Sequence, residues 1–104
     1  MLMEEIKEDN GLEQTQLSEK PVIVIHNDPV MQSALDAISI FGKHKEITLR
    51  AKGNSIPNAV AVANIIIENL MKEKSKIQKI SVDSEPIKEI GRTQSSIEII
   101  INKI

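Results

Sequence analysis

Polar and apolar residues alternate along three parts of the chain. These parts are residues 45–52, 77–84 and 95–103. Each alternation predicts a β-strand with one face toward a core and the other toward water. In the first strand, Ile47, Leu49 and Ala51 share the inner face, whereas Arg50 and Lys52 share the outer face.

Residues 21–25, with the sequence PVIVI, form a fourth candidate strand. Their β-branched side chains favour extended backbone, and neither face of the strand is polar. A strand that is apolar on both faces is typical of the middle of a sheet. We therefore expect a central position for this strand.

Two further segments carry apolar residues at helical spacing. The first follows Asp28 and Pro29, an acid and a proline that are typical of a helix start. It extends to about Phe41 and ends at Gly42. We expect the carboxylate of Asp28 to accept backbone hydrogen bonds at this helix start, which would stabilise it by about 0.5–2 kcal/mol.

The second helix is expected to begin at Ser55, with Pro57 in its first turn, and to extend to about Lys72. Its apolar residues form two stripes. One stripe is Val60, Ala63, Ile67 and Leu70, and the other is Val62, Ile65, Ile66 and Met71. A helix with two apolar sides must bury both. The sheet covers one side, and a second subunit is the natural cover for the other.

Between the last two strands lies the polar segment 85–94, EPIKEIGRTQ. It is too long for a two-residue turn and predicts a projecting β-hairpin arm whose tip includes Gly91 and Arg92. The element order is therefore β-α-β-α-β-β. We expect an α/β two-layer sandwich, with a mixed four-stranded sheet, two helices on one of its faces and the arm projecting beyond it.

Charge divides the 104 residues into two parts. Residues 1–19 contain one lysine and six acidic residues, a net charge of −5, and show no apolar period. We expect them to form a disordered acidic tail. Residues 20–104 contain twelve basic and nine acidic residues, a net charge of +3, and are expected to form the folded domain. The tail either keeps the protein in solution or competes with phosphates for the basic face of the domain.

The sequence offers little for catalysis or for a cofactor. It has no cysteine, and His26 and His44 lack partners at the spacing of a metal site. No serine has the context of a nucleophile elbow, and residues 51–55, AKGNS, hold only one of the glycines of a phosphate-binding loop. We expect no enzyme activity, no metal ion, no cofactor and no small-molecule substrate.

The sequence does not indicate a membrane protein either. No apolar run approaches the roughly 20 residues that span a bilayer. The N-terminal segment is acidic and lacks the basic-then-apolar order of a signal peptide. We expect a cytoplasmic protein.

Basic side chains give the clearest indication of function. Arg50 and Lys52 are expected to converge on the start of the second helix, where backbone N–H groups favour a phosphate. Lys88 and Arg92, in the arm, are placed to reach a second phosphate. Such contacts bind nucleic acid without reading its sequence, and Phe41, the only aromatic residue, leaves almost nothing for base stacking. The alternative interpretation of each basic residue is an ordinary solvated charge.

Three stretches, taken in order, resemble the Alba proteins, a family of small archaeal chromatin and RNA-binding proteins. They are DPVMQSALDAI at 28–38, ITLRAKGNSIPNAVAVANII at 47–66 and GRTQSSIEIIINK at 91–103. The resemblance implies a fold shared with the C-terminal domain of a bacterial translation initiation factor. It also implies a dimer that binds DNA with little sequence preference, binds RNA as well, and associates with the chromosome. On that pattern, Arg50, Lys52 and Arg92 are the expected nucleic-acid contacts.

The chain departs from the family pattern at several basic positions. Family members typically carry adjacent lysines before the first helix, one of which is acetylated, and here those positions are Asn27 and Asp28. A further basic position beyond the turn glycine is Asn54. Asn27 and Asn54 stay candidate contacts by position. Each lost phosphate contact lowers the salt slope of binding by about 0.9, so we expect weaker binding than in basic relatives.

Two hypotheses follow. In the first, the protein binds duplex DNA, and RNA as well, as a dimer through phosphate contacts, and organises the chromosome. In the second, it keeps the family's dimer surface, pairs with a more basic paralogue and modulates how that partner coats DNA. The sequence leaves open whether the dimer is a homodimer or a heterodimer.

Overall fold

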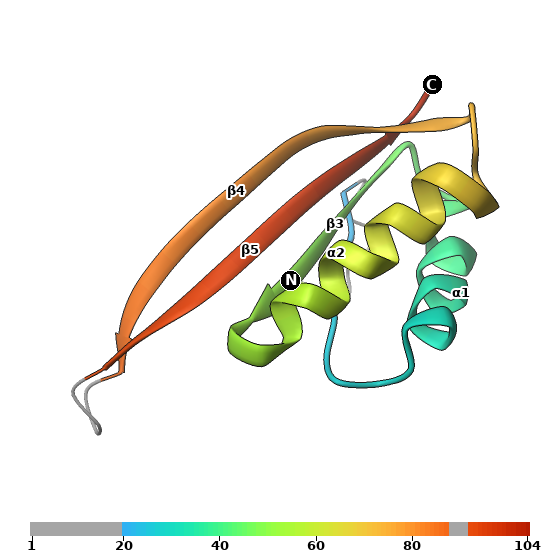
Figure 1. The fold of residues 1–104 in the computed structure, drawn as a ribbon. Coiled ribbons are helices and arrows are strands. Elements are labelled where there is room, and N and C mark those ends of the chain that lie inside the picture. Colours follow the sequence, from blue (N-terminus) through green and yellow to red (C-terminus); the bar gives the residue numbers. More distant parts are fainter. Residues whose placement is uncertain (1–19, 88–91) are drawn as a thin grey trace, which may run out of the picture.

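A mixed four-stranded sheet with two helices against one face forms the domain (Figure 1). The computed structural model describes residues 20–87 and 92–104, so the expected acidic tail lies outside the described residues. The strands are β2 (Val22–Val24), β3 (Glu46–Lys52), β4 (Ser75–Ile87) and β5 (Arg92–Lys103), in the order β2-β3-β5-β4. β2 is parallel to β3, and β5 is antiparallel to both of its neighbours. The predicted fold class and element order are confirmed.

The helical layer consists of two helices and two irregular turns. They are α1 (Val30–Phe41), the 3-10 turn η1 (Gly53–Ser55), α2 (Ile56–Ile65) and the π-helical turn η2 (Ile66–Leu70). The N–H of Met71 donates to the carbonyl of Ile66 at 2.8 Å, five residues back, which closes the wide last turn. α1 ends at Phe41 as predicted, and the second helical segment ends close to the predicted position. No helix among the described residues has the length and apolarity to cross a bilayer.

The helix starts differ from expectation. Pro29, not Asp28, is the N-cap residue of α1, and no side chain caps that helix. Because the helix begins only after the proline, the Asp28 carboxylate lies one position too far out to accept its first N–H groups. Ser55 does occupy the N-cap position of α2, but its hydroxyl donates to Oδ1 of Asn27 at 3.3 Å instead of capping the helix.

Aliphatic side chains fill the space between the sheet and the helices. The buried apolar residues of the sheet are Ile47, Leu49, Ala51, Ile97, Ile99 and Ile101, and those of the helical layer are Ala34, Ala37, Phe41, Ala59, Val62, Ala63 and Ile66. Two polar residues of the sheet, Thr48 and Ser75, are buried as well. The predicted alternation in β3 and β5 is therefore confirmed. The alanines on both helices let them approach the sheet closely, and Phe41 is the largest buried side chain.

β2 lies at an edge of the sheet, so the expected central position is wrong. Val22 and Val24 are 46% and 51% exposed on the face that carries no helix, and only Ile23 and Ile25 turn toward the core. β-branched residues suit an extended edge strand as well as a central one. Apolarity on both faces was therefore not sufficient to place this strand.

The other edge strand, β4, forms a long curved hairpin with β5 that extends beyond the helices (Figure 1). Ile77, Ile80 and Val82 pair with buried isoleucines of β5 and so face the same side as the helices. α2 packs over β3 and β5, and these three side chains stay exposed, with Val82 at 70%. We call Ile77, Ile80 and Val82 the uncovered apolar strip.

Candidate nucleic-acid interface

The face of the sheet that carries no helix presents the two basic residues expected to bind phosphate. Here a hollow of about 360 Å³ crosses β3, β5 and β4. It is lined by Arg50, Lys52, Ser81, Asp83, Glu85, Ser96 and Glu98, which we call the open groove. Two basic and three acidic residues give the open groove a net charge of −1, so its basic side chains face acids rather than open water.

Arg50 is held by Glu98, which lies directly opposite it on β5. The Nε of Arg50 donates to Oε2 of Glu98 at 2.8 Å, and its Nη2 lies 2.6 Å from the same oxygen. The two side chains are 43% and 42% exposed. Ion pairs this exposed contribute only about 0–1 kcal/mol to stability. A phosphate can therefore exchange with Glu98 at small cost to the fold.

Lys52 makes a looser pair across the open groove. Its Nζ lies 3.7 Å from Oε1 of Glu85 on β4, and both side chains are more than half exposed. The charged ends of Arg50 and Lys52 thus lie against acids on the neighbouring strands. The expected convergence of the two on the start of α2 stays a prediction, because these contacts describe only their pairs with Glu98 and Glu85.

At the end of β3, two turns are joined by polar contacts. Besides the contact between Ser55 and Asn27, the Nδ2 of Asn58 donates to the carbonyl of His26 at 3.0 Å. Asn27 therefore lies beside the start of α2, and the exposed Asn54 precedes Ser55 in the same turn. The structure brings these two candidate residues to one end of the sheet, next to Lys52.

Gly53 makes this turn. Its φ of +53° is in the left-handed region, which glycine adopts without steric cost. A Cβ at this position would lie 3.1 Å from Nε2 of Gln94 on β5. The glycine therefore serves both the backbone geometry and the close approach of β5.

The arm is a continuation of the β4–β5 ladder. Glu85 pairs with Gln94 and Ile87 with Arg92, so the predicted hairpin arm is confirmed up to its tip. Arg92 is the first residue of β5, four positions before Ser96, the partner of Lys52. The distance along β5 between Arg92 and Ser96 is about 13 Å. It corresponds to about four successive phosphates on one strand of a DNA duplex. Lys88 lies outside the described residues.

Sequence reasoning could not pair the acids of the open groove with its two basic residues. Alternation within residues 95–103 puts Glu98 on the same outer face as Arg50. Only the register between β3 and β5 shows that the two face each other. His44, for which the sequence indicates no role, is half-buried in the wall of a second hollow. Among the described residues, no group of three or more histidine, aspartate or glutamate side chains gathers closely enough to hold a metal ion.

A mixed sheet with helices on one face, a long projecting strand pair and charged side chains on the open face define a small α/β sandwich domain with a sheet-and-arm surface. Comparison with known families agrees with that architecture. The chain belongs to the Alba family, whose model matches residues 20–84.

Individual relatives support the assignment. The DNA/RNA-binding protein Alba of Methanocella arvoryzae is 32% identical over 91 residues, which cover 84% of this chain and 94% of that protein. The structure of Alba from Thermoplasma volcanium matches with a TM-score of 0.67 at 29% identity, over 78% of this chain and 98% of that one. The structure of ALBA1 from Trypanosoma brucei matches with a TM-score of 0.64 at 17% identity, over 79% and 68% of the two chains, and shows the shared fold alone.

Proposed function

We propose that the protein binds duplex DNA, and RNA as well, through phosphate contacts with little sequence preference, and that it helps to organise the chromosome. The Alba family and the printed name of the relative from Methanocella arvoryzae support nucleic acid as the ligand. The observation that carries the site is the row formed by Arg50 and Lys52 on an open sheet face that continues into the arm. Such a row matches a backbone of phosphates rather than one base.

The contacts in this proposal come from both the groove and the arm. Arg50 and Lys52 exchange their acidic partners for phosphates, and Lys88 and Arg92 extend the contact along the arm. Asn27 and Asn54 border this contact surface at the turn beside the start of α2. Neither asparagine is charged, so the proposed binding depends mainly on the four basic residues and is weak and strongly dependent on salt.

A dimer is part of the proposal. The uncovered apolar strip supports it, because a soluble monomer rarely leaves β-branched side chains together on an uncovered sheet face. Val60 of α2 and Leu70 of η2 are exposed as well, which agrees in part with the second apolar stripe expected for that helix. A second subunit over β4 would cover the strip.

Salt-dependent binding to a duplex DNA and to an RNA tests this function. We expect Arg50→Gln with Lys52→Gln to lower the slope of log K against log salt by about 1.8 per protomer, at about 0.9 per contact. Lys72→Gln, an exposed lysine outside the groove, is the control for loss of net charge and should change the slope much less per charge. No binding at low salt, or binding that ignores salt, would contradict the proposal.

A second candidate function is pairing with a more basic Alba paralogue. The net charge of −1 in the open groove favours it, since the uncovered apolar strip would be kept while the phosphate surface is weakened. Mixing the protein with a lysine-bearing paralogue and separating the species by charge tests this directly. Formation of the two homodimers alone would argue against it.

A further inference from the structure

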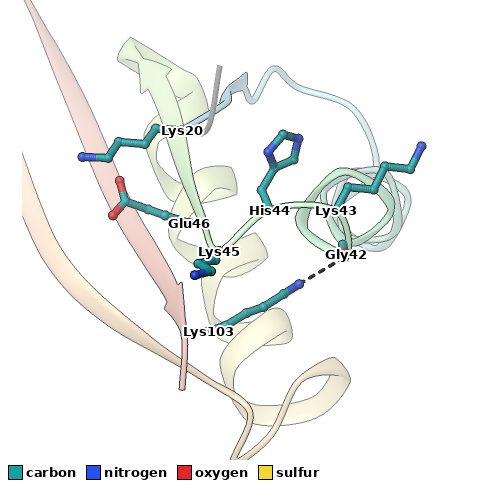
Figure 2. Close-up of a pocket in the computed structure, with 7 residues that line it drawn as sticks. All are labelled: Lys20, Gly42, Lys43, His44, Lys45, Glu46 and Lys103. Atoms are coloured by element: carbon teal, nitrogen blue, oxygen red, sulfur yellow. Dashed lines mark hydrogen bonds between the residues drawn. The ribbon is translucent and has the colours of Figure 1, made fainter. Parts of the chain in front are cut away.

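A second hollow, of about 550 Å³, lies at the end of β3 opposite the open groove (Figure 2). It is lined by Lys20, Gly42, Lys43, His44, Lys45, Glu46 and Lys103, which we call the basic pole. Four lysines and one glutamate give the basic pole a charge of +3 with His44 neutral. The open groove, which carries −1, is the less positive of the two surfaces. The proposed function makes no use of the basic pole.

Three separate parts of the chain build the basic pole. The connection from α1 to β3 supplies residues 42–45. Lys20 precedes β2, which runs parallel to β3. Lys103 closes β5 beside the start of β3, where its N–H donates to the carbonyl of Lys45 at 2.9 Å. Sheet pairing therefore gathers lysines that are far apart in sequence.

Lys103 has a structural role at the basic pole. Its Nζ donates to the carbonyl of Gly42 at 3.1 Å and lies 5.6 Å from the centre of the Phe41 ring. A cation at this place also complements the negative end of α1. These contacts explain one lysine of the four and fix its charge at the edge of the hollow.

Lys43 and Lys45 have no comparable explanation. Both are exposed, and neither makes an ion pair with any residue in the described part of the chain. The dipole of α1 favours cations only within about its last turn, by about 0.3–1 kcal/mol, and Lys45 already leads into β3. Like charges gathered in one place repel one another, and no carboxylate of the described residues pairs with either lysine to offset that repulsion.

The geometry favours a row of phosphates over one small enclosed anion. Figure 2 shows Lys43 and Lys45 extending in different directions instead of converging on a point. The backbone N–H groups of Gly42, Lys43 and His44 all donate to carbonyls at the end of α1, so none is left to hold a single anion. Diverging lysines, beside three backbone N–H groups already used at the end of α1, suit the extended backbone of a nucleic acid.

Neighbouring strand ends enlarge this surface. Ser75 pairs with Lys103 and Lys76 with Asn102, which places the beginning of β4 beside the basic pole. Lys74 and Lys76 are both exposed there. The positive charge thus continues from the α1–β3 connection across the end of the sheet.

We propose that the basic pole is a phosphate-contact surface for nucleic acid, separate from the open groove. This inference rests on the proposed function, since it takes the same ligand. Their nearest lining residues on β3, Glu46 and Arg50, are four positions apart, which is about 13 Å of strand. The basic pole supplies the larger part of the attraction, because Lys43 and Lys45 have no acidic partner among residues 20–87 and 92–104 that a phosphate would have to displace.

The test compares two charge-matched variants of the full chain in salt-dependent binding to duplex DNA. Lys43→Gln with Lys45→Gln removes two charges at the basic pole, and Arg50→Gln with Lys52→Gln removes two at the other end of β3. We expect the first pair to lower affinity about tenfold or more at about 0.1 M salt and to lower the salt slope by about 1.8. Lys72→Gln again measures the effect of net charge alone.

The outcomes separate the two proposals. If the Lys43 and Lys45 pair matches Lys72→Gln per charge while the Arg50 and Lys52 pair loses binding, the inference is wrong and the proposed function stands. If the wild-type protein binds no nucleic acid, both fail. Should the first variant not fold, duplex titration of the wild-type protein decides: shifted backbone amide resonances at residues 43–46 support the inference, and unchanged ones overturn it.

Discussion

Arg50 and Glu98 face each other across β3 and β5, and two guanidinium nitrogens of Arg50 share one carboxylate oxygen of Glu98. Their partial exposure means that the pair contributes little to stability. Its effect on binding is larger, since any phosphate that approaches Arg50 meets a carboxylate already in place. Under the proposed function, Glu98 therefore competes with phosphate for Arg50.

Glu98→Gln should raise affinity for duplex DNA severalfold at low salt. The change removes one negative charge from the groove and leaves an amide of the same shape, so Arg50 becomes available to phosphate. Titration of a labelled duplex measures the effect. Glu68→Gln, an exposed glutamate on η2, is the control, and equal gains for both variants would show that only net charge matters.

Asn27→Lys with Asp28→Lys should strengthen DNA binding about tenfold or more and steepen its salt slope. Both residues are exposed, and Asn27 lies beside the start of α2 through Ser55. Asp28 caps no helix, so its replacement costs the fold little. A control with the same charge change is Asp36→Lys with Ser39→Lys on the exposed side of α1. Unchanged affinity in the first variant would remove this turn from the binding surface.

Removal of residues 1–19 should raise affinity for DNA at low salt and have little effect at high salt. The removed segment carries −5, and it joins the domain at Lys20, which borders the basic pole. Attraction between an exposed acidic segment and lysines is screened over about 10 Å at 0.1 M salt. Affinity measured at two salt concentrations checks this. Equal affinities of the two chains at low salt would leave solubility as the role of the segment.

Val82→Glu should weaken self-association, because it places a charge in the uncovered apolar strip. Sedimentation equilibrium measures the result. Val24→Glu is a matched control, since Val24 is an exposed valine in the opposite edge strand and on the opposite face of the sheet. Both variants should melt close to the wild-type domain. If the Val82→Glu and Val24→Glu variants associate to the same extent, the uncovered apolar strip is not the dimer surface.

Local patterns in the sequence predicted local structure well. Alternation in residues 45–52 placed Arg50 and Lys52 outward because a period of two is a property of each strand by itself. The position of β2 depends on which strands flank it, and the partner of Arg50 depends on a register across 48 residues. A local pattern of polar and apolar residues predicts neither the position of β2 nor the partner of Arg50.

The basic pole shows the same limit of sequence reasoning. Lys43 and Lys45 lie in a short polar connection whose local pattern predicts no site, and Lys20 and Lys103 stand at opposite ends of the domain's sequence. They meet because β2 and β3 begin, and β5 ends, at the same side of the sheet. The start of α1 differs from the prediction by one residue: the N-cap is Pro29 instead of Asp28. That shift leaves the Asp28 carboxylate too far from the first N–H groups of the helix to accept from them.

The unequal charges at the two ends of β3 give the domain an electric polarity along that strand. In the field of a polyanion, such a molecule rotates during its approach, so that its positive end arrives first. Encounter with DNA would then begin at the basic pole. The open groove and the arm would bind afterwards, when a phosphate replaces the Glu98 carboxylate at Arg50. Under the two proposals, the sheet would therefore set the order in which contacts form as well as their positions, and salt would act chiefly on the first step, the rate of association.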